Sequence, residues 1–478
     1  MHFNDLNDDV IEIIFCIHVC VNNQTKVGLL LTCRRWYAIA LNVKALWKTI
    51  CVGNHYDFPS SKVIVGTVDS LLHAIERAGD TPFELRFAKL RRPFEREIKG
   101  RVDSVVQMDC LRRCRSLILR FPRPPKWPGR TVDGHILKEM ILNATTLETL
   151  ESITWTQYAW ASLADLYSTL LARAESLAPH LKTLKVECDF ENPPIFFPIL
   201  YAGLFGRIQR LQIISIARPV PWELFPNLEH LEFIGGEYHE PSARSNLSEI
   251  AAPNLTSLYL GGRIQRSDFP EKEVLQQLER LAFKDCKLPD GQPPFPSSFP
   301  SLTYLEYRPD YDHDYCLSHV SAPELEELMT SNRGLSTQYL KPSYITPRIL
   351  RLTMKYGLKH DEITEAPAAW SKVEELHLDG YRPEIPHVLT NALSREAPDP
   401  FPRLRVLTVR YIWYRGNVPP SGKEACIQEL RAIVAARRDN GLSLLERVEL
   451  GWYIYCPYYG REPYEELCVT HWTDCLQD

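Results

Sequence analysis

The segment FPNLEHLEF at residues 225–233 is the first clear copy of a phrase that recurs through the second half of the chain. Each copy holds a six-residue core, and apolar residues usually stand at its first, fourth and sixth positions. Successive cores follow one another with a period of roughly 25 residues, and only the last interval is clearly longer. The copies are FPNLEHLEF at 225, APNLTSLYL at 252, LQQLERLAF at 275, FPSLTYLEY at 299, APELEELMT at 322, TPRILRLTM at 346, WSKVEELHL at 370 and FPRLRVLTV at 401.

This repetition predicts a stack of parallel strands that share one core. Leucine-rich repeats have periods of ~20–29 residues, and each contains one strand of the form L-x-x-L-x-L. A single repeat cannot bury its inward leucines alone, so neighbouring repeats stack against one another. We therefore expect an α/β fold, in which residues 81–478 form an irregular leucine-rich-repeat solenoid with a curved parallel sheet and a C-terminal cap. Weaker copies begin near Cys114, Leu147, Leu181, Ile208 and Leu445, which raises the expected number of strands to about thirteen.

The segments between the strands are predicted to be variable. Typical repeats place Asn or Cys three residues after the last strand leucine, and among the clear copies only Cys286 fits that pattern. Two connecting segments are expected to be true helices, at 162–177 and at 421–439. In the second of these, Ser421 can cap the start of the helix and Gly441 can end it.

Alternate residues of a strand point to opposite faces, so the polar positions of the cores are expected to form one face of the sheet. Acidic pairs such as Glu326–Glu327 and Glu374–Glu375 fall on this face and are expected to be solvated. The face carries both signs of charge, which suits a protein target better than nucleic acid. Most aromatic residues near the C-terminus are expected to close the end of the solenoid. The candidate target-binding residues are Glu232, Tyr259, Glu306 and His377 on strands, and Tyr458 and Tyr459 in a loop flanked by Pro and Gly.

The N-terminal segment follows a helical pattern. Residues 8–21 place apolar side chains around an arc of roughly 220°, which is wider than the ~100° stripe needed to cover one core. A second helix is expected at about 25–40, and a third, short helix carries Leu46, Trp47 and Ile50. Three helices of this size form a weak core by themselves. The wide arc therefore needs a second surface, which is either an external partner or the solenoid.

Three blocks of this segment resemble an F-box. That motif reads Leu-Pro-x-Glu-Leu-Leu-x-x-Ile-Phe, then Val-Cys-Lys-x-Trp, then Leu-Trp. This chain has LNDDVIEIIF at 6–15, TCRRW at 32–36 and LW at 46–47. The family's proline is Asn7 here and its glutamate is Asp9, so the entry turn departs from the pattern while the apolar face is kept. The matching residues are Leu6, Val10, Ile11, Ile14, Phe15, Cys33, Trp36, Leu46 and Trp47.

The resemblance implies a three-helix F-box over residues 1–52, followed by a linker and a helix over 53–80. The segment 71–87 is also similar to a stretch that follows the F-box in many fungal members, and it reads as a helix and then a strand. An F-box binds the Skp-type adaptor of a cullin-based ubiquitin ligase. The resemblance thus implies a substrate-recognition subunit that contacts the adaptor through the nine matching residues, reaches the cullin through the adaptor, and holds a protein target.

In this interpretation the protein is not an enzyme, because a ubiquitin-conjugating enzyme elsewhere in the complex performs the chemistry. The sequence contains no glycine-rich phosphate loop, no G-x-S-x-G turn and no H-E-x-x-H helix. Two alternatives stay open. One is an adaptor-bound scaffold that ubiquitinates nothing, and the other is an enzyme with a site in the aromatic C-terminal loops.

Composition narrows the setting of this function. A net charge of −5 offers no basic footprint for nucleic acid. No apolar run is long enough to span a bilayer and the N-terminus has no signal-peptide pattern, so we expect a cytoplasmic or nuclear protein that is monomeric within its complex. We expect no cofactor and no metal. One group of residues has the side-chain types of a zinc site, but its spacing matches no common zinc module: Cys456, Cys468, His471 and Cys475.

Overall fold

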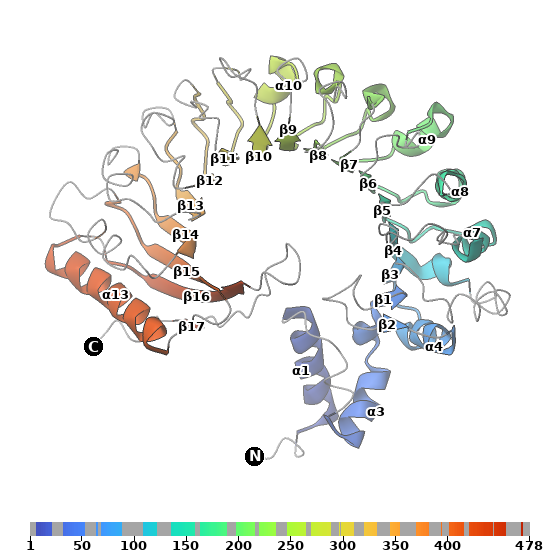
Figure 1. Ribbon diagram of the computed structural model, residues 1–478, viewed down its shortest axis with the longest axis horizontal. Coiled ribbons are helices and arrows are strands. Elements are labelled where there is room, and N and C mark those ends of the chain that lie inside the picture. The colour runs from blue at the N-terminus through green and yellow to red at the C-terminus, as the bar shows by residue number, and fades with distance from the viewer. Residues whose placement is uncertain are drawn as a thin grey trace. The chain divides into compact units, whose positions relative to one another are not determined.

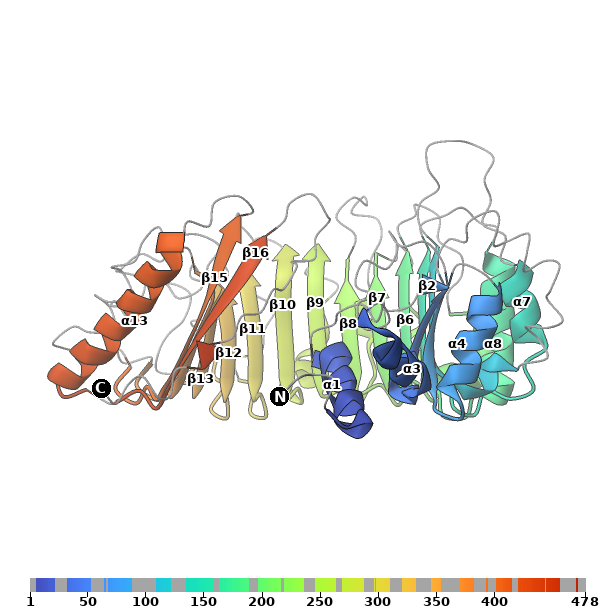
Figure 2. The same cartoon turned by 90° about the horizontal axis from the view of Figure 1, so that it is seen from below.

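The computed structural model divides the chain into two compact units, formed mostly by residues 1–232 and mostly by residues 255–478. Both units are α/β and are built on parallel strands (Figure 1; Figure 2). The structure describes residues 6–21, 32–52, 64–65, 68–87, 109–121, 135–157, 163–188, 197–215, 219–235, 246–263, 269–287, 296, 298–309, 320–331, 345–353, 370–381, 393, 401–414, 420–442, 444–455 and 470–471.

The first unit begins with packed helices. Helix α1 (Asp8–Val21) lies against α3 (Arg34–Asn42), and the 3-10 helix η2 (Lys44–Trp47) follows. Phe15 of α1 is fully buried, and its ring meets the ring of Trp36 edge-on with centroids 5.1 Å apart. Aromatic pairs in this geometry stabilise a fold by about 0.5–1.5 kcal/mol beyond the burial of their area. The two helices are therefore held together mainly by this aromatic contact and the apolar residues around it.

The helix predicted over residues 8–21 is confirmed by α1. The second predicted helix, at 25–40, falls partly outside the described residues, and α3 begins only at Arg34. The third is a single 3-10 turn. The three-helix arrangement expected of an F-box is therefore not evident in the described part of this segment.

The helical segment passes directly into the sheet. Lys48 alone separates η2 from strand β1 (Thr49–Val52), which pairs in parallel with β3 (Phe83–Phe87). Ile50 was expected on the third helix, and that expectation is wrong, because Ile50 lies in β1. A four-residue apolar run cannot be assigned to helix or strand by periodicity alone. The expected linker thus starts after a strand that already belongs to the sheet.

In the first unit, consecutive strands from β3 to β7 pair in parallel. The helices between them lie on one face of this sheet (Figure 1). The helix expected at 162–177 is confirmed by α8. The further strands are β2 (Ile64–Val65), β4 (Cys114–Phe121), β5 (Ser152–Gln157), β6 (Thr183–Cys188), β7 (Arg210–Ile214) and β8 (His230–Ile234). The helices are α4 (Val68–Ala78), α7 (His135–Leu142), α8 (Ala164–Leu177) and α9 (Ala202–Phe205), with the 3-10 turns η4 (Cys110–Arg113), η5 (Ile199–Tyr201) and η6 (Trp222–Leu224). Strand β8 is divided between the two units, and the next 3-10 turn, η7 (Leu247–Glu249), belongs to the second unit.

In the second unit, eight strands from β9 to β16 follow one another in parallel. The short strand β17 pairs antiparallel to β16. The repeat prediction is confirmed here, because the cores that begin at 255, 278, 302, 325, 349 and 373 form neighbouring strands of one parallel sheet. The strands are β9 (Ser257–Arg263), β10 (Arg280–Lys287), β11 (Tyr304–Pro309), β12 (Glu327–Ser331), β13 (Ile349–Thr353), β14 (Glu375–Tyr381), β15 (Val406–Tyr414), β16 (Arg447–Tyr455) and β17 (Thr470–His471), and the helices are α10 (Lys272–Gln276) and α13 (Pro420–Asp439).

The leucines of the repeated phrase form the core of each unit. In the second unit, Leu350, Leu376 and Leu407 are in register on adjacent strands and are fully buried. Burying one such side chain stabilises the fold by about 1.5–3 kcal/mol. The helix predicted over 421–439 is confirmed by α13, which is followed by Gly441 at a φ of +65°, a backbone conformation that glycine adopts readily.

Candidate target-binding face

Residues that alternate with the core leucines of β9–β16 form a second face of the sheet, which we call the polar face. The strands are paired without a shift in this region, so equivalent residues of the repeats line up across the sheet. The central row of the polar face runs Tyr259, Ala282, Glu306, Met329, Arg351, His377, Thr408 and Glu449.

The predicted target-binding residues fall largely on this row. Tyr259, Glu306 and His377 occupy equivalent positions of it, while Glu232 is half-buried on β8. Tyr458 and Tyr459 lie outside the described residues. Arg351 was not predicted on this row, because the copy TPRILRLTM at 346 aligns Thr353 with His377. The register of β13 shows that this copy was aligned two residues late, so Arg351 takes the equivalent position.

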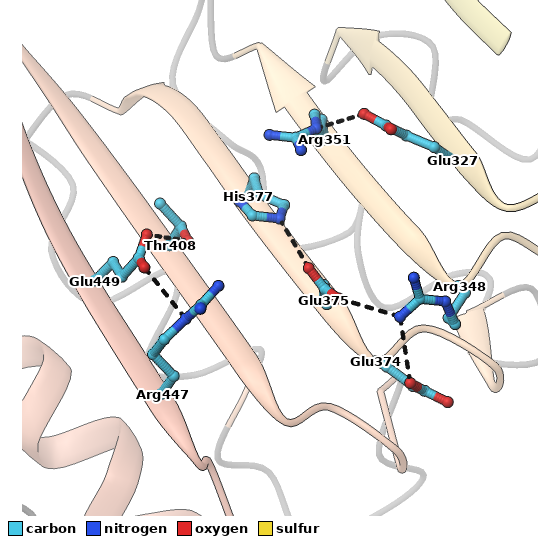
Figure 3. Close-up of polar contacts among 9 residues, drawn as sticks. All are labelled: Glu327, Arg348, Arg351, Glu374, Glu375, His377, Thr408, Arg447 and Glu449. Atoms are coloured by element: carbon cyan, nitrogen blue, oxygen red, sulfur yellow. Dashed lines mark hydrogen bonds and ion pairs between the residues drawn. The ribbon is translucent and has the colours of Figure 1, made fainter. Parts of the chain in front are cut away.

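Ion pairs cross the polar face between neighbouring strands (Figure 3). The Nε of Arg351 lies 2.5 Å from Oε1 of Glu327, and an Nη of Arg348 lies 3.1 Å from Oε1 of Glu375. On β16, Arg447 pairs with Glu449 at 3.2 Å, and that carboxylate also accepts a hydrogen bond of 3.3 Å from the Thr408 hydroxyl. These pairs are partly exposed, so each stabilises the fold by about 0–1 kcal/mol. Their main effect is to fix the orientation of side chains on the face.

The acidic residues of the face are therefore not simply solvated, as the sequence had suggested. Glu327 and Glu375 are each matched to an arginine of a neighbouring repeat. Glu306 is nearly covered, with 8% of its surface exposed. Its Oε2 accepts a 3.1 Å hydrogen bond from the hydroxyl of Tyr304, and the guanidinium of Arg280 stacks 4.2 Å from the centre of that tyrosine ring. Burial, and then the neighbouring Glu306 carboxylate, raise the pKa of the Tyr304 hydroxyl, which keeps it a hydrogen-bond donor.

His377 lies at the centre of this network, and only 6% of its surface is exposed. Burial lowers the pKa of the imidazole below 6.5, and the Arg351 cation lowers it further, while Glu375 and Asp379 act in the opposite direction. The ring is therefore neutral at pH 7. Its Nε2 lies 3.6 Å from Oε2 of Glu375, which is close enough for an electrostatic contact but too long for a hydrogen bond.

The helical segment presents a different kind of surface. Among the described side chains of this segment, the most exposed large apolar ones are Ile13, Tyr37 and Val10, at 58%, 48% and 41% exposure. Val10 and Ile13 stand three positions apart on α1, and Tyr37 comes from the neighbouring α3, so apolar side chains of both helices face outward. Exposed apolar side chains on two packed helices favour contact with another protein over contact with water.

The residues expected to bind an adaptor divide into two groups in this structure. Val10 is exposed, and Leu6, Ile14 and Trp36 are half-buried, so these can meet a partner. Cys33 is exposed, and its sulfur accepts a 3.4 Å hydrogen bond from the Trp36 backbone N–H at the start of α3. The remaining four are covered by the chain itself, so they support the surface from beneath without forming it: Ile11, Phe15, Leu46 and Trp47.

The first unit also has a shallow groove of about 260 Å³ at the ends of β6 and β7 where these strands begin. Its polar side chains are partly engaged with one another. The Gln209 amide donates to Glu229 at 2.9 Å, and the Asn227 amide donates to the Gly206 carbonyl at 2.7 Å. Small-molecule sites usually measure ~300–1,000 Å³ and are mostly apolar. We therefore assign no ligand to this groove.

Within the described part of the chain, no three His, Cys, Asp or Glu side chains are grouped as a metal site requires. Of the four residues weighed as zinc ligands, Cys456, Cys468 and Cys475 lie outside the described residues, and of His471 only the backbone is described.

Among the helices described, none combines the length and apolar character needed to cross a bilayer. No protein-family model matches the chain, and no curated protein matches it either.

Proposed function

We propose that this protein is the substrate-recognition subunit of a Skp–cullin–F-box ubiquitin ligase. Residues 1–52 act as the F-box and bind a Skp-type adaptor, and through it a cullin. The solenoid over residues 81–478 holds a protein target, and the polar face is its binding surface in the second unit. The observation that carries the proposal is the exposed apolar surface of Val10, Ile13 and Tyr37, because it lies in the segment that resembles an F-box.

An adaptor that covers these side chains removes apolar area from water, at about 25 cal/mol per Å². The buried group beneath them gives the surface a fixed shape before binding, which reduces the entropy lost on association. Phe15 and Trp36 provide that support through their ring contact. The small helical segment therefore has both an apolar surface for a partner and an internal core that holds the surface in place.

The polar face suits a protein target for a separate reason. It carries paired charges of both signs on the five adjacent strands β12–β16, together with tyrosines on β9 and β11. Holding a target beside a ubiquitin-conjugating enzyme converts a bimolecular encounter into an effectively intramolecular one, so positioning alone accelerates transfer. In this proposal the chain has no catalytic residue, needs no cofactor, and works in the cytoplasm or the nucleus.

Co-expression with a Skp-type adaptor tests the proposal. We expect a stable one-to-one complex by size-exclusion chromatography with light scattering. The double substitution Val10→Glu and Ile13→Glu should weaken binding at least a hundredfold, because each charge would lose its hydration in an apolar contact. Both side chains are exposed, so the helices should still fold.

Leu200→Glu is the matched control, because Leu200 is 75% exposed on η5 and lies outside the F-box-like segment. This variant should bind the adaptor as tightly as the unmodified chain. A wild-type chain with no affinity for the adaptor would overturn the proposal, and so would a double variant that binds normally. If the cellular abundance of the target does not change when this protein is deleted, the scaffold alternative is favoured.

A further inference from the structure

Two neighbouring polar side chains on the polar face lack hydrogen-bond partners. Both ring nitrogens of His377 and the hydroxyl oxygen of Thr353 are buried without a hydrogen bond within the part of the chain that the structure describes, and the Nε2 of His377 has only its 3.6 Å contact with Glu375 (Figure 3). Arg351 is paired with His377 in the register between β13 and β14, so Thr353, two residues further on, is a diagonal neighbour of His377 on the same face. Buried polar groups are rarely left unpaired in native proteins, and each exception needs an explanation.

The charges that surround this pair are already engaged. Arg351 is paired with Glu327, Glu375 is paired with Arg348 (Figure 3), and Asp379 is paired with Arg410 at 3.1 Å. A charged ligand would have to compete with these contacts. The groups that can still form hydrogen bonds here are both neutral: the imidazole of His377 and the hydroxyl of Thr353.

We propose that His377 and Thr353 form a subsite on the polar face that receives the side-chain carboxamide of an Asn or Gln residue of the target. A neutral imidazole offers one donor and one acceptor, and a hydroxyl offers both as well. A carboxamide has an N–H₂ donor and a carbonyl acceptor, so it can pair with both groups at once. A carboxylate could accept from both groups and an ammonium could donate to both, but either would bring an unbalanced charge into a nearly covered site whose neighbouring charges are already paired.

The recessed position of the subsite selects a side chain over a peptide backbone. His377 is almost covered, and the longer side chains of Arg351 and Glu375 stand beside it (Figure 3). A target backbone cannot approach as closely as the tip of a side chain can. This inference rests on the proposed role of the polar face in target binding, and it names the chemistry that the face selects.

The subsite should also lose affinity in acid, because protonation of His377 removes its acceptor nitrogen and adds a charge that a neutral amide does not match. The neutral form prevails at pH 7 and is lost as the pH falls through the lowered histidine pKa, below 6.5. The polar and charged groups around the ring on its own and adjacent strands are Arg351 and Thr353 on β13, Glu375 and Asp379 on β14, and Thr408 and Arg410 on β15, with Glu449 beyond them on β16.

Selection from a random dodecapeptide display library against the full chain tests the subsite. We expect the bound peptides to share an Asn or Gln at one position, and their affinity to fall at least ~tenfold with Thr353→Val or His377→Phe. Thr353→Val keeps the shape of the side chain and removes only the hydroxyl. Thr303→Val is the matched control, because Thr303 precedes β11, lies off the central row of the polar face and donates its hydroxyl to the Glu279 carbonyl at 3.1 Å, and it should leave the selected affinity within about twofold.

Selected peptides should also bind more weakly once the pH is lowered from 7.5 through the lowered pKa of His377, and His377→Phe should abolish that loss. A library that yields no binder dependent on His377 or Thr353 overturns the inference, and so does one that selects a charged residue at the dependent position. Adaptor binding in the same preparations reports the proposed function separately. If the chain selects amide-bearing peptides but does not bind the adaptor, the subsite is supported and the ubiquitin-ligase proposal is refuted.

Discussion

Glu429 illustrates how one buried residue can govern the response of the second unit to pH. It lies on α13 with 7% of its surface exposed, and neither carboxylate oxygen has a hydrogen-bond partner among the described residues. Burial raises the pKa of this carboxyl from 4.5 to about 8. Between these two values the folded state holds a proton that the unfolded state releases, so stability falls as the pH rises from 4.5 through 8.

Glu429→Gln should therefore stabilise the second unit in alkaline solution and leave it unchanged in acid. The amide is neutral at every pH, so the cost of burying a carboxylate disappears. We expect the melting temperature at pH 8.5 to rise by about 2–4 °C over wild type, with no difference at pH 4. Thermal unfolding followed by circular dichroism measures this. Equal melting temperatures at pH 8.5 would mean that the carboxylate finds a partner or water in solution.

At the residue scale, the sequence predicted which strand position a residue occupies better than it predicted the burial and hydrogen bonds of its side chain. The place of Glu306 and His377 on one row followed from the spacing of the leucines, and the register confirms it. Their burial did not follow from the sequence, because it depends on which long side chains the strands of the neighbouring repeats contribute. The Thr353 hydroxyl went unnoticed for the same reason, since an unpaired group is recognisable only when all its neighbours are placed.

At the scale of elements, the junction between the helices and the sheet decides whether the segment 1–52 is a separable module. Strand β1 contributes three fully buried residues, Ile50, Cys51 and Val52, and its partner β3 begins only at Phe83. The backbone N–H of Glu84 also donates to the Lys48 carbonyl at 2.7 Å. On the other side of the junction, the Arg77 guanidinium lies 4.9 Å from the centre of the Trp47 ring.

A fragment of residues 1–52 should therefore fail to fold by itself, because it exposes β1 and the ring of Trp47. We expect little helical signal by far-ultraviolet circular dichroism and poorly dispersed amide resonances. A longer fragment of residues 1–90, which restores α4 and β3, should recover helical signal. A shorter fragment with well-dispersed amide signals would contradict this and would show that α1 and α3 form an independent domain.

Elements with a strong repeated pattern were the predictable ones. The strands β9–β12 and β14 lie where the leucine period placed them, and α13 ends just before Gly441 as predicted. The copy at 346 was aligned two residues late relative to β13, and α13 begins at Pro420, one residue before the predicted cap Ser421. Strand β1 was missed because TICV is too short to show a period, and its strand conformation depends on pairing with a distant segment. The helix at 8–21 followed from its apolar pattern, whereas its contact with α3 and the outward orientation of Ile13 depended on how the helices pack.

At the scale of the whole molecule, stability should be distributed among repeats more than concentrated in one centre. Each strand of a unit packs mainly on its immediate neighbours, and such arrays behave as a sum of repeats and nearest-neighbour interfaces. The chain forms two compact units, so damage in one repeat should spread along its own unit first. Leu376 of the second unit and Leu184 of the first are equivalent core leucines, and each is almost fully buried.

Leu376→Ala should remove about 2–5 kcal/mol of stability, because the cavity left by the leucine is flanked by packed strands that can relax only in part. Hydrogen exchange followed by mass spectrometry should show faster exchange in β13, β14 and β15, and smaller changes further along the second unit. The strands β4 to β7 should keep their protection. Leu184→Ala should give the opposite pattern, with β5, β6 and β7 exchanging faster and the second unit unchanged. Equal loss of protection in both units from either variant would mean that the chain unfolds as a single cooperative body, and that the boundary near β8 has no energetic meaning.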